Sequence, residues 1–352
     1  MKIDGKHIGP NVPPFIIAEI GANHNGSVAE GKRLINAAID TGASAIKLQC
    51  YTADKLTFRG EGNEFKIMEG PWKGQSLHEL YTKAETPRNL LKELLLYGQS
   101  KGMTTFSSVF ALEDVDFLAE LGVPAFKIAS FELTDLPLIW ESAATGLPLI
   151  ISTGMGTTQE IKDAINAYRI RRPHPGNNLA LLHCISSYPA LPSEANLPAL
   201  GPLANLLADN HGCAVGLSDH TLGVGCAAAA VAFGASIIEK HFTLNRNSGG
   251  PDSGFSLEPA EFFNLVRTCN EAWQAIQTDS APKKSPNLAF RKSLYAVREI
   301  SAGERFCKEN VRSIRPAAGL APKFYQSVLA GVATQDIKAG TPLHSSMVSV
   351  LE

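Results

Sequence analysis

AFKIAS at residues 125–130 and PLIIST at residues 148–153 are short, apolar runs that each end in polar residues. Six similar runs occur between residue 15 and about residue 245: FIIAEI at 15, SAIKLQ at 44, TTFSSVF at 104, LALLHCI at 179, AVGLSD at 214 and SIIEKHF at 236. Amphipathic stretches that close on glycine, such as 28–42 and 112–122, lie between them and predict helices. Eight strands that alternate with helices over about 250 residues predict a TIM barrel, an α/β fold.

The rival α/β architecture is an open, doubly wound sheet, but no GxGxxG turn follows the first run. A polar stretch with two prolines then separates a second region from the barrel. We therefore predict a barrel over 1–277, a linker over 278–287 and a small domain over 288–352. In that domain EISAGERFCKENV (299–311) resembles DIKAGTPLHSSMV (336–348), which indicates a compact pseudo-symmetric module.

Composition excludes several classes of protein. Hydrophobic residues make up 44% and charged residues 19% of the chain, which is typical of a globular protein. The formal net charge of −2, without a basic stripe, argues against a nucleic-acid partner. The six cysteines form no CxxC pair, so we expect free thiols in a reducing compartment. No apolar run has the length of a signal or membrane segment, so we expect a cytoplasmic protein with no membrane partner.

Polar residues end every predicted strand, at the edge where TIM barrels carry their active sites. In chain order they are Glu19; Lys47 and Gln49; Ser107 and Ser108; Lys127, Ser130 and Glu132; Ser152 and Thr153; His183, Ser186, Ser187 and Tyr188; Ser218, Asp219 and His220; and Glu239, Lys240 and His241. Eight polar strand ends that meet at one mouth predict a single pocket.

Two lysines indicate the class of ligand. Lys47 and Lys127 lie within otherwise apolar strands, although lysine is rarely buried without a partner. Two inward ammonium groups among hydroxyls favour an anionic ligand, such as a phosphate or a carboxylate. The turn at residues 152–156 is expected to add backbone N–H groups to this site. The alternative is that each lysine pairs with a structural carboxylate, for instance Glu19 or Glu132.

Two histidines indicate a metal ion. His220 and His241 end the last two strands, which are neighbours in a barrel, so their imidazoles could share a divalent ion. Glu239 faces the same way as His241, and Glu19 lies on the first strand, beside the eighth once the barrel closes. The alternative is that each histidine is only a hydrogen-bonded pocket residue. Alternation along the strand turns His183 toward the helical layer instead.

Several of these segments resemble the sialic acid synthase family, in order and along the whole barrel. They are FIIAEIGANHNG, AIKLQCYTADKL, KIASFEL, ISTGMGT, LLHCISSYP, GLSDHTLG, IEKHFTL and GGPDSGFSLEP. The tail, RKSLYAVREISAGE followed by NVRSIRP, resembles that family's C-terminal antifreeze-like (SAF) domain. The resemblance implies a TIM barrel followed by a small SAF domain. It also implies an enzyme that condenses phosphoenolpyruvate with a 2-acetamido sugar, releases phosphate and uses a divalent metal ion, Mn²⁺ or Mg²⁺.

The resemblance also implies roles for single residues. Phosphoenolpyruvate would be held by Lys47, Ser108, Lys127, Ser130, Ser152 and Ser218. His220 and His241 would bind the metal ion, and Glu19, Tyr188, Glu239 and Asp252 would line the acceptor and metal side. Glu19, Glu239 and His220 are the catalytic candidates. Arg315 would reach the active site from the partner subunit of a domain-swapped homodimer. The chain departs from the family pattern at Ser186, an acceptor-site position where the family carries Asn, and at Ala317, where IRPG is expected.

Residues 65–87, FKIMEGPWKGQSLHELYTKAETP, resemble the pseudaminic acid synthase branch of the family. This implies 2,4-diacetamido-2,4,6-trideoxy-L-altrose as the acceptor. The alternative within the family is an N-acetylneuraminate or legionaminic acid synthase that uses a manno-configured acetamido sugar. Two other classes also stay open: a Schiff-base aldolase with Lys127 or Lys47 as nucleophile, and a carbohydrate- or ice-binding protein that acts through residues 288–352.

Overall fold

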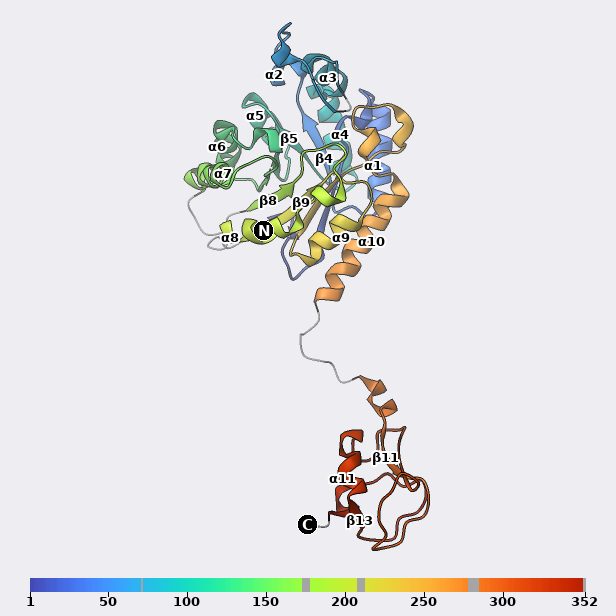
Figure 1. Cartoon of the computed structure of the whole chain (residues 1–352). Coiled ribbons are helices and arrows are strands. Elements are labelled where there is room, and N and C mark those ends of the chain that lie inside the picture. Colours follow the sequence, from blue (N-terminus) through green and yellow to red (C-terminus); the bar gives the residue numbers. More distant parts are fainter. Residues whose placement is uncertain (71, 173–177, 208–212, 278–284, 351–352) are drawn as a thin grey trace. The chain divides into compact units, whose positions relative to one another are not determined.

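The computed structural model describes residues 1–70, 72–172, 178–207, 213–277 and 285–350. The chain forms two compact units, Met1–Thr278 and Asp279–Glu352 (Figure 1). Of the predicted linker 278–287, residues 278–284 lie outside the described part of the chain, and Pro286–Phe290 form a short 3-10 helix. Within the described residues, no helix is both long enough and apolar enough to cross a membrane.

Eight parallel strands close into a barrel in the first unit. They are β3 (Phe15–Glu19), β4 (Ala45–Cys50), β5 (Thr104–Val109), β6 (Phe126–Ile128), β7 (Leu149–Ser152), β8 (Leu179–Cys184), β9 (Ala214–Asp219) and β10 (Ile237–His241). The order around the barrel is β10-β3-β4-β5-β6-β7-β8-β9, so the last strand pairs with the first. The predicted TIM barrel is confirmed, and each predicted run contains one strand.

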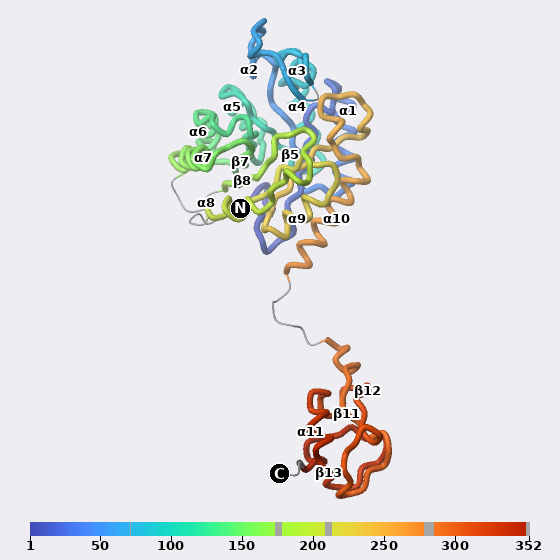
Figure 2. The backbone as a smooth tube through the Cα atoms, viewed as in Figure 1, coloured from blue at the N-terminus to red at the C-terminus, as the bar shows by residue number. Residues whose placement is uncertain are grey.

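Helices surround these strands, as Figure 1 shows. They are α1 (Val28–Asp40), α2 (Ala53–Leu56), α3 (Leu77–Ala84), α4 (Arg88–Ser100), α5 (Glu113–Glu120), α6 (Leu136–Ala144), α7 (Thr158–Arg171), α8 (Leu200–Leu206), α9 (Gly225–Ala232) and α10 (Pro259–Ile276). Successive helices pack side by side, for example α6 with α7 and α9 with α10 (Figure 2). A hairpin of β1 (Lys2–Ile3) and β2 (Lys6–His7) precedes the barrel.

Local sequence explains where these elements begin and what they bury. Every residue of β3 and β5 is buried, as expected for parallel strands that are covered on both faces. Ser76 and Thr157 start α3 and α7 with capping boxes, in which side chain and backbone satisfy each other's hydrogen bonds. Phe242 and Phe262 meet edge to face at 5.4 Å, which packs α10 against the end of β10.

The second unit has its own small core. Strand β11 (Ser293–Ala296) pairs with β12 (Val311–Ile314), β13 (Gly331–Ala333) pairs with β14 (Val348–Val350), and α11 spans Tyr325–Leu329. The two copies of the sequence repeat lie against each other, because Ile300 and Ile337 exchange backbone hydrogen bonds of 2.9 and 2.8 Å. In both copies the Ala-Gly turn has its glycine, Gly303 or Gly340, at positive φ, where other residues would be strained.

Candidate active site

The strand register gathers the predicted polar residues at one end of the barrel. Glu19 lies opposite both Lys47 and His241, because β3 pairs with β4 and with β10. Farther around the ring, Ser108 lies opposite Lys127, and Ser218 lies opposite Glu239. These residues are buried, with exposed fractions of 8% or less. One pocket at the carboxyl ends of the strands therefore collects residues from six different strands.

Lys47 is held by carboxylates and a hydroxyl. Its Nζ forms an ion pair with Glu19 and donates to Ser108 Oγ at 2.9 Å. Glu239 Oε2 lies 3.9 Å from the same Nζ. The alternative that Lys47 pairs with Glu19 is therefore realised in part. Because Glu19 also faces the pocket, this pairing does not remove the lysine from it.

Lys127 lies on the other side of Glu239. Its Nζ donates to Ser152 Oγ at 2.7 Å and to the main-chain oxygen of Ile128 at 2.9 Å. Glu239 Oε1 is 3.9 Å from this Nζ and accepts a hydrogen bond from Ser218 at 3.0 Å. One carboxylate thus stands between two ammonium groups, and an anionic ligand would find two cations close together.

Burial and these charges shift the pKa values of the four groups in different directions. Burial raises the pKa of Glu19 to about 7, although Lys47 opposes the shift. Burial also raises the carboxyl pKa of Glu239, but Lys127 and Lys47 outweigh it and the net shift is downward. Burial lowers the pKa of Lys127, whereas for Lys47 the carboxylates Glu19 and Glu239 outweigh burial and raise it. Glu239 is therefore ionised at neutral pH, while Glu19 can exchange a proton there.

The turn after β7 contributes hydroxyls and a close approach. A Cβ on Gly154 would lie 2.4 Å from Ser186 Oγ and 2.8 Å from Ser130 Oγ, so only glycine lets the two serines come this close. The expectation that this turn supplies free N–H groups is wrong for three of its residues. The N–H groups of Thr153, Gly154 and Gly156 already donate hydrogen bonds within the protein.

The two predicted histidines lie side by side, with ring centroids 5.5 Å apart. His220 Nδ1 lies 2.9 Å from the main-chain oxygen of Ile185, so this nitrogen carries the proton and Nε2 is left with a lone pair. Burial lowers the pKa of His220, but contacts with Cys184 and the Ile185 carbonyl outweigh burial and raise it. Binding of a cation at Nε2 would therefore compete with a proton.

His241 is the clearer metal-ligand candidate. Its Nδ1 is buried without a hydrogen-bond partner and lies 3.7 Å from Asp252 Oδ2. Burial holds the imidazole pKa well below its usual value, so the ring is neutral and keeps a lone pair for a cation. Among the described residues, no three His, Cys, Asp or Glu side chains form a set that could hold a metal ion. The residues fit an ion that is held by two imidazoles, with water or substrate in its other positions.

Asp252 reaches this site because of a glycine. Gly21 has φ of +51°, and a Cβ there would lie 2.2 Å from Asp252 Oδ2. The same oxygen accepts a hydrogen bond from the N–H of Ala22 at 3.0 Å. Burial raises the pKa of Asp252. Any larger residue at position 21 would push this carboxylate away from His241.

An aromatic cavity adjoins the imidazoles. The Tyr188 ring lies 4.3 Å from that of His220, 5.1 Å from Phe255 and 6.0 Å from Trp72, between centroids. These three aromatic residues line a cavity of about 750 Å³. Its polar lining comes from Asn25, Gln75, Lys83, Arg246 and Ser253. Apolar rings with a few polar groups suit a ligand that is part apolar and part hydroxylated, such as a deoxy acetamido sugar.

One strand-end residue, His183, lies away from this pocket, and Arg315 belongs to the other unit. His183 bonds the main-chain oxygen of Ala195 at 2.8 Å, so it faces away from the pocket as expected. Arg315 belongs to the C-terminal unit, where it is exposed. The loop that follows Arg315 is held by Ser293. The Oγ of Ser293 donates to the main-chain oxygen of Pro316 and accepts from the N–H groups of Ala318 and Gly319.

Four residues at the site had no role assigned from the sequence. Gln49 donates to Glu19 Oε1 at 3.0 Å, and Cys184 Sγ lies 3.9 Å from His220 Nδ1. Gln49 is among the predicted strand-end residues, two residues after Lys47 on the same strand, but its contact with Glu19 was not predicted. Trp72 lies in a turn and Phe255 ends a three-residue 3-10 helix, and neither segment is long enough for a periodicity to tell which way its side chain points.

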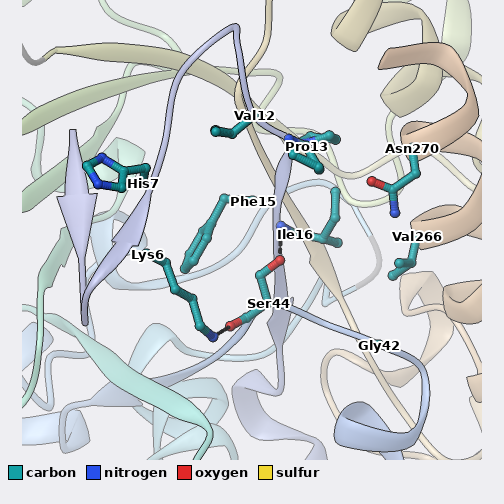
Figure 3. Close-up of a pocket in the computed structure, with 11 residues that line it drawn as sticks. Lys6, His7, Val12, Pro13, Phe15, Ile16, Gly42, Ser44, Val266 and Asn270 are labelled. Carbon is teal, nitrogen blue, oxygen red and sulfur yellow. Dashed lines mark hydrogen bonds between the residues drawn. The ribbon is translucent and has the colours of Figure 1, made fainter. Parts of the chain in front are cut away.

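A smaller cavity, of about 240 Å³, lies at the opposite end of the barrel (Figure 3). It is lined by residues at or just before the first residues of β3 and β4, including Phe15, Ile16 and Ser44. Lys6 Nζ donates to the main-chain oxygen of Ser44 at 2.7 Å, and Ser44 Oγ accepts from the N–H of Ile16 at 3.0 Å. None of the predicted site residues lines this cavity, so we place the active site at the other end.

Known proteins share this architecture. The NeuB family profile matches residues 34–281, and the SAF domain profile matches residues 291–349. Pseudaminic acid synthase from Campylobacter jejuni is 40% identical over 332 residues, which are 94% of this chain and 95% of that protein. N,N'-diacetyllegionaminic acid synthase from Legionella pneumophila is 36% identical and covers 97% of both chains. The solved N-acetylneuraminic acid synthetase from Leptospira borgpetersenii has a TM-score of 0.71 and 32% identity, over 81% of this chain and 92% of that one. The chain therefore belongs to the NeuB family and ends in a SAF domain.

Proposed function

We propose that this protein joins phosphoenolpyruvate to the open-chain form of a 2-acetamido sugar, giving a nonulosonic acid and phosphate. The observation that carries the proposal is the pair of buried lysines, Lys47 and Lys127, on either side of Glu239 and beside two imidazoles. Phosphoenolpyruvate has a phosphate and a carboxylate a few bonds apart, and two neighbouring ammonium groups complement that charge pattern. The names of the two curated relatives given above, a pseudaminic acid synthase and an N,N'-diacetyllegionaminic acid synthase, support the same reaction class.

The acceptor that we propose is 2,4-diacetamido-2,4,6-trideoxy-L-altrose. Pseudaminic acid synthase is among the most similar relatives, and the cavity beside His220 is lined by Trp72, Tyr188 and Phe255. Aromatic rings offer contact to acetamido methyl groups and to a 6-deoxy carbon. The alternative acceptor is a manno-configured acetamido sugar, as for an N-acetylneuraminate or legionaminic acid synthase.

The residues of the pocket suggest how the reaction is arranged. Phosphate and carboxylate would be held by Lys47, Lys127, Ser108, Ser130, Ser152 and Ser218. C3 of phosphoenolpyruvate then attacks the aldehyde carbon, a water molecule adds at C2, and phosphate leaves with cleavage of its bond to C2. Glu19, with its pKa near 7, can take the proton of that water, and Glu239 stays ionised between the lysines. Mn²⁺ or Mg²⁺ held by His220 and His241 would supply a Lewis acid for the aldehyde oxygen.

We further propose a domain-swapped homodimer in which Arg315 of one copy acts on the barrel of the other. Four large apolar side chains are exposed on the loops that follow β6 to β9: Phe131, Met155, Leu191 and Leu222, at 63, 62, 60 and 52%. Such a rim suits coverage by a protein surface. Co-expression of Lys127→Gln and Arg315→Ala chains tests this. Only a swapped dimer places an intact barrel under an intact Arg315, so mixed dimers would regain activity that both parents lack. Failure to regain it would contradict the swap.

The reaction is tested by phosphate release from phosphoenolpyruvate with a panel of altrose-, mannose- and glucose-type acetamido sugars. We expect the diacetamido altrose compound to be used at least about 100-fold better, in kcat/KM, than N-acetylmannosamine. The reverse preference would replace the acceptor, and no release with any sugar would reject the reaction. Borohydride treatment with pyruvate is the second arm, because the lowered pKa of Lys127 also suits a Schiff base. A trapped adduct would favour the aldolase.

A further inference from the structure

A buried ion pair lies on the outer face of the two strands that carry the histidines. Lys240 Nζ donates to Asp219 Oδ2 at 2.6 Å, and the two side chains are only 1% and 2% exposed. Lys240 Nζ also donates to the main-chain oxygen of Thr221 at 2.6 Å. Asp219 Oδ1 in turn accepts from the N–H and the hydroxyl of Thr221, at 2.9 and 2.8 Å. We call these three residues the outer cluster.

The outer cluster brackets both imidazoles. Asp219 and Thr221 flank His220, and Lys240 immediately precedes His241. Lys240 and Asp219 are direct partners in the β9–β10 register. Because successive residues of a strand point to opposite faces, the cluster lies behind the pocket while the histidines face into it. Its hydrogen bonds therefore fix the backbone on both sides of His220 relative to the backbone beside His241.

Stability alone does not explain such a pair. The residues two positions earlier on the same faces, Leu217 and Ile238, are apolar and buried. Replacing a buried ion pair by apolar residues of similar size is often neutral or stabilising, because desolvation of two charges offsets their attraction. What the ion pair adds is directional geometry, since both carboxylate oxygens of Asp219 and the ammonium of Lys240 make defined hydrogen bonds.

We propose that the outer cluster of Asp219, Thr221 and Lys240 positions the two imidazoles and so sets the affinity of the site for a divalent cation. The three are positioning residues, because none of them faces the pocket. This inference rests on the proposed function only in placing a divalent ion at His220 and His241. Partners that orient metal-binding histidines typically account for about 10- to 100-fold in metal affinity.

The test is a titration of chelator-stripped protein with Mn²⁺ in the absence of substrates. The free Mn²⁺ is measured by its electron paramagnetic resonance signal. We expect Asp219→Asn to raise the Kd by about 10- to 100-fold, and Thr221→Val, which removes one hydrogen bond, to raise it less. The matched control is Asp114→Asn. Asp114 is as buried as Asp219, and the substitution breaks its ion pairs with the partly exposed Lys55 and Arg88, at 2.6 Å each, on another side of the barrel. This control should lower the melting temperature but leave the Kd within about two-fold of the native value.

The outcomes distinguish a failure of the positioning role from a failure of the proposed metal site. If Asp219→Asn does not fold, the double variant Asp219→Asn/Lys240→Met, which leaves no unpaired charge, takes its place with the same expectation. Native Mn²⁺ affinity in a folded Asp219 variant, together with lost affinity in His241→Ala, would overturn the positioning role alone. If the native protein does not bind Mn²⁺, or if His241→Ala binds it as well as the native chain, the proposed metal site itself is rejected.

Discussion

The polar groups at the two ends of the barrel differ in how fully they are paired. Around the cavity at the amino ends of β3 and β4, the exposed Lys6 and the half-buried Ser44 are hydrogen bonded within the protein. Seven buried side-chain atoms of the described residues have no hydrogen-bond partner. Five of them lie at the carboxyl ends of the strands or in the loops that follow: Glu19 Oε2, Asn23 Oδ1, Glu132 Oε2, Glu239 Oε2 and His241 Nδ1. The other two, Ser142 Oγ and Tyr168 OH, lie on α6 and α7. Each such atom costs about 1–3 kcal/mol. Most of the unpaired buried atoms therefore lie at the carboxyl end of the barrel, where a bound ligand would supply hydrogen-bond partners for them.

Substitution of one lysine at each end, Lys127 and Lys6, tests this comparison most directly. We expect Lys127→Gln to lower kcat/KM for phosphate release by about 10³-fold, because it removes a charge that faces the phosphoenolpyruvate site. Lys6→Gln removes a lysine that is also hydrogen bonded, but at the opposite end, and should leave kcat/KM within about two-fold. Equal losses in the two variants would show that the ends are not functionally different.

Removal of a metal ion comes next in size. Chelation should abolish phosphate release, and Mn²⁺ or Mg²⁺ should restore it. His241→Ala should weaken Mn²⁺ binding by about 100-fold or more, since it removes one of two protein ligands. His183→Ala, on the face away from the pocket, serves as the control and should bind Mn²⁺ normally. Full activity of metal-stripped protein would rule out this part of the account.

Substitution of Trp72 tests whether the aromatic cavity beside the imidazoles binds the sugar rather than phosphoenolpyruvate. Trp72→Ala should raise the KM for the sugar by about 10-fold, because an aromatic wall is lost, and should leave the KM for phosphoenolpyruvate unchanged. Trp140→Ala changes another partly exposed tryptophan, on α6, which stacks on Arg171 instead. Steady-state kinetics with each substrate varied in turn gives the KM for the sugar and the KM for phosphoenolpyruvate separately. A rise in KM for phosphoenolpyruvate alone would place Trp72 elsewhere in the reaction.

The smallest effect is expected for Glu132→Gln, on the pH dependence of the free energy of unfolding. Burial raises the pKa of Glu132 to about 7 from an ordinary value of 4.5, so the folded state holds the proton more tightly than the unfolded state. The resulting stabilisation is complete below about pH 4.5 and is lost as the pH rises through about 7. We expect Glu132→Gln to remove about 1–2 kcal/mol of this pH dependence between pH 5 and 8, measured by urea unfolding. Glu141→Gln, exposed on α6, should remove none of it.

Much of this arrangement could be predicted from sequence because strands have a period of two. The period placed Lys47 and Lys127 inward and His183 outward, and barrel closure then brought Glu19 beside His241. Tertiary contacts settled the rest. The N–H groups of the turn at residues 152–156 were expected to be free, but three of them are used by internal bonds. Trp72 lies in a turn and Phe255 in a short 3-10 helix, and the directions of both side chains depend on contacts far away in the sequence.

A crystal structure with Mn²⁺ and phosphoenolpyruvate would test the central claim most directly. We expect the ion within about 2.0–2.3 Å of one nitrogen of each imidazole, His220 and His241. The phosphate and carboxylate of phosphoenolpyruvate should lie within hydrogen-bond distance of Lys47 Nζ and Lys127 Nζ. An ion bound elsewhere, or phosphoenolpyruvate that touches neither lysine, would contradict the account.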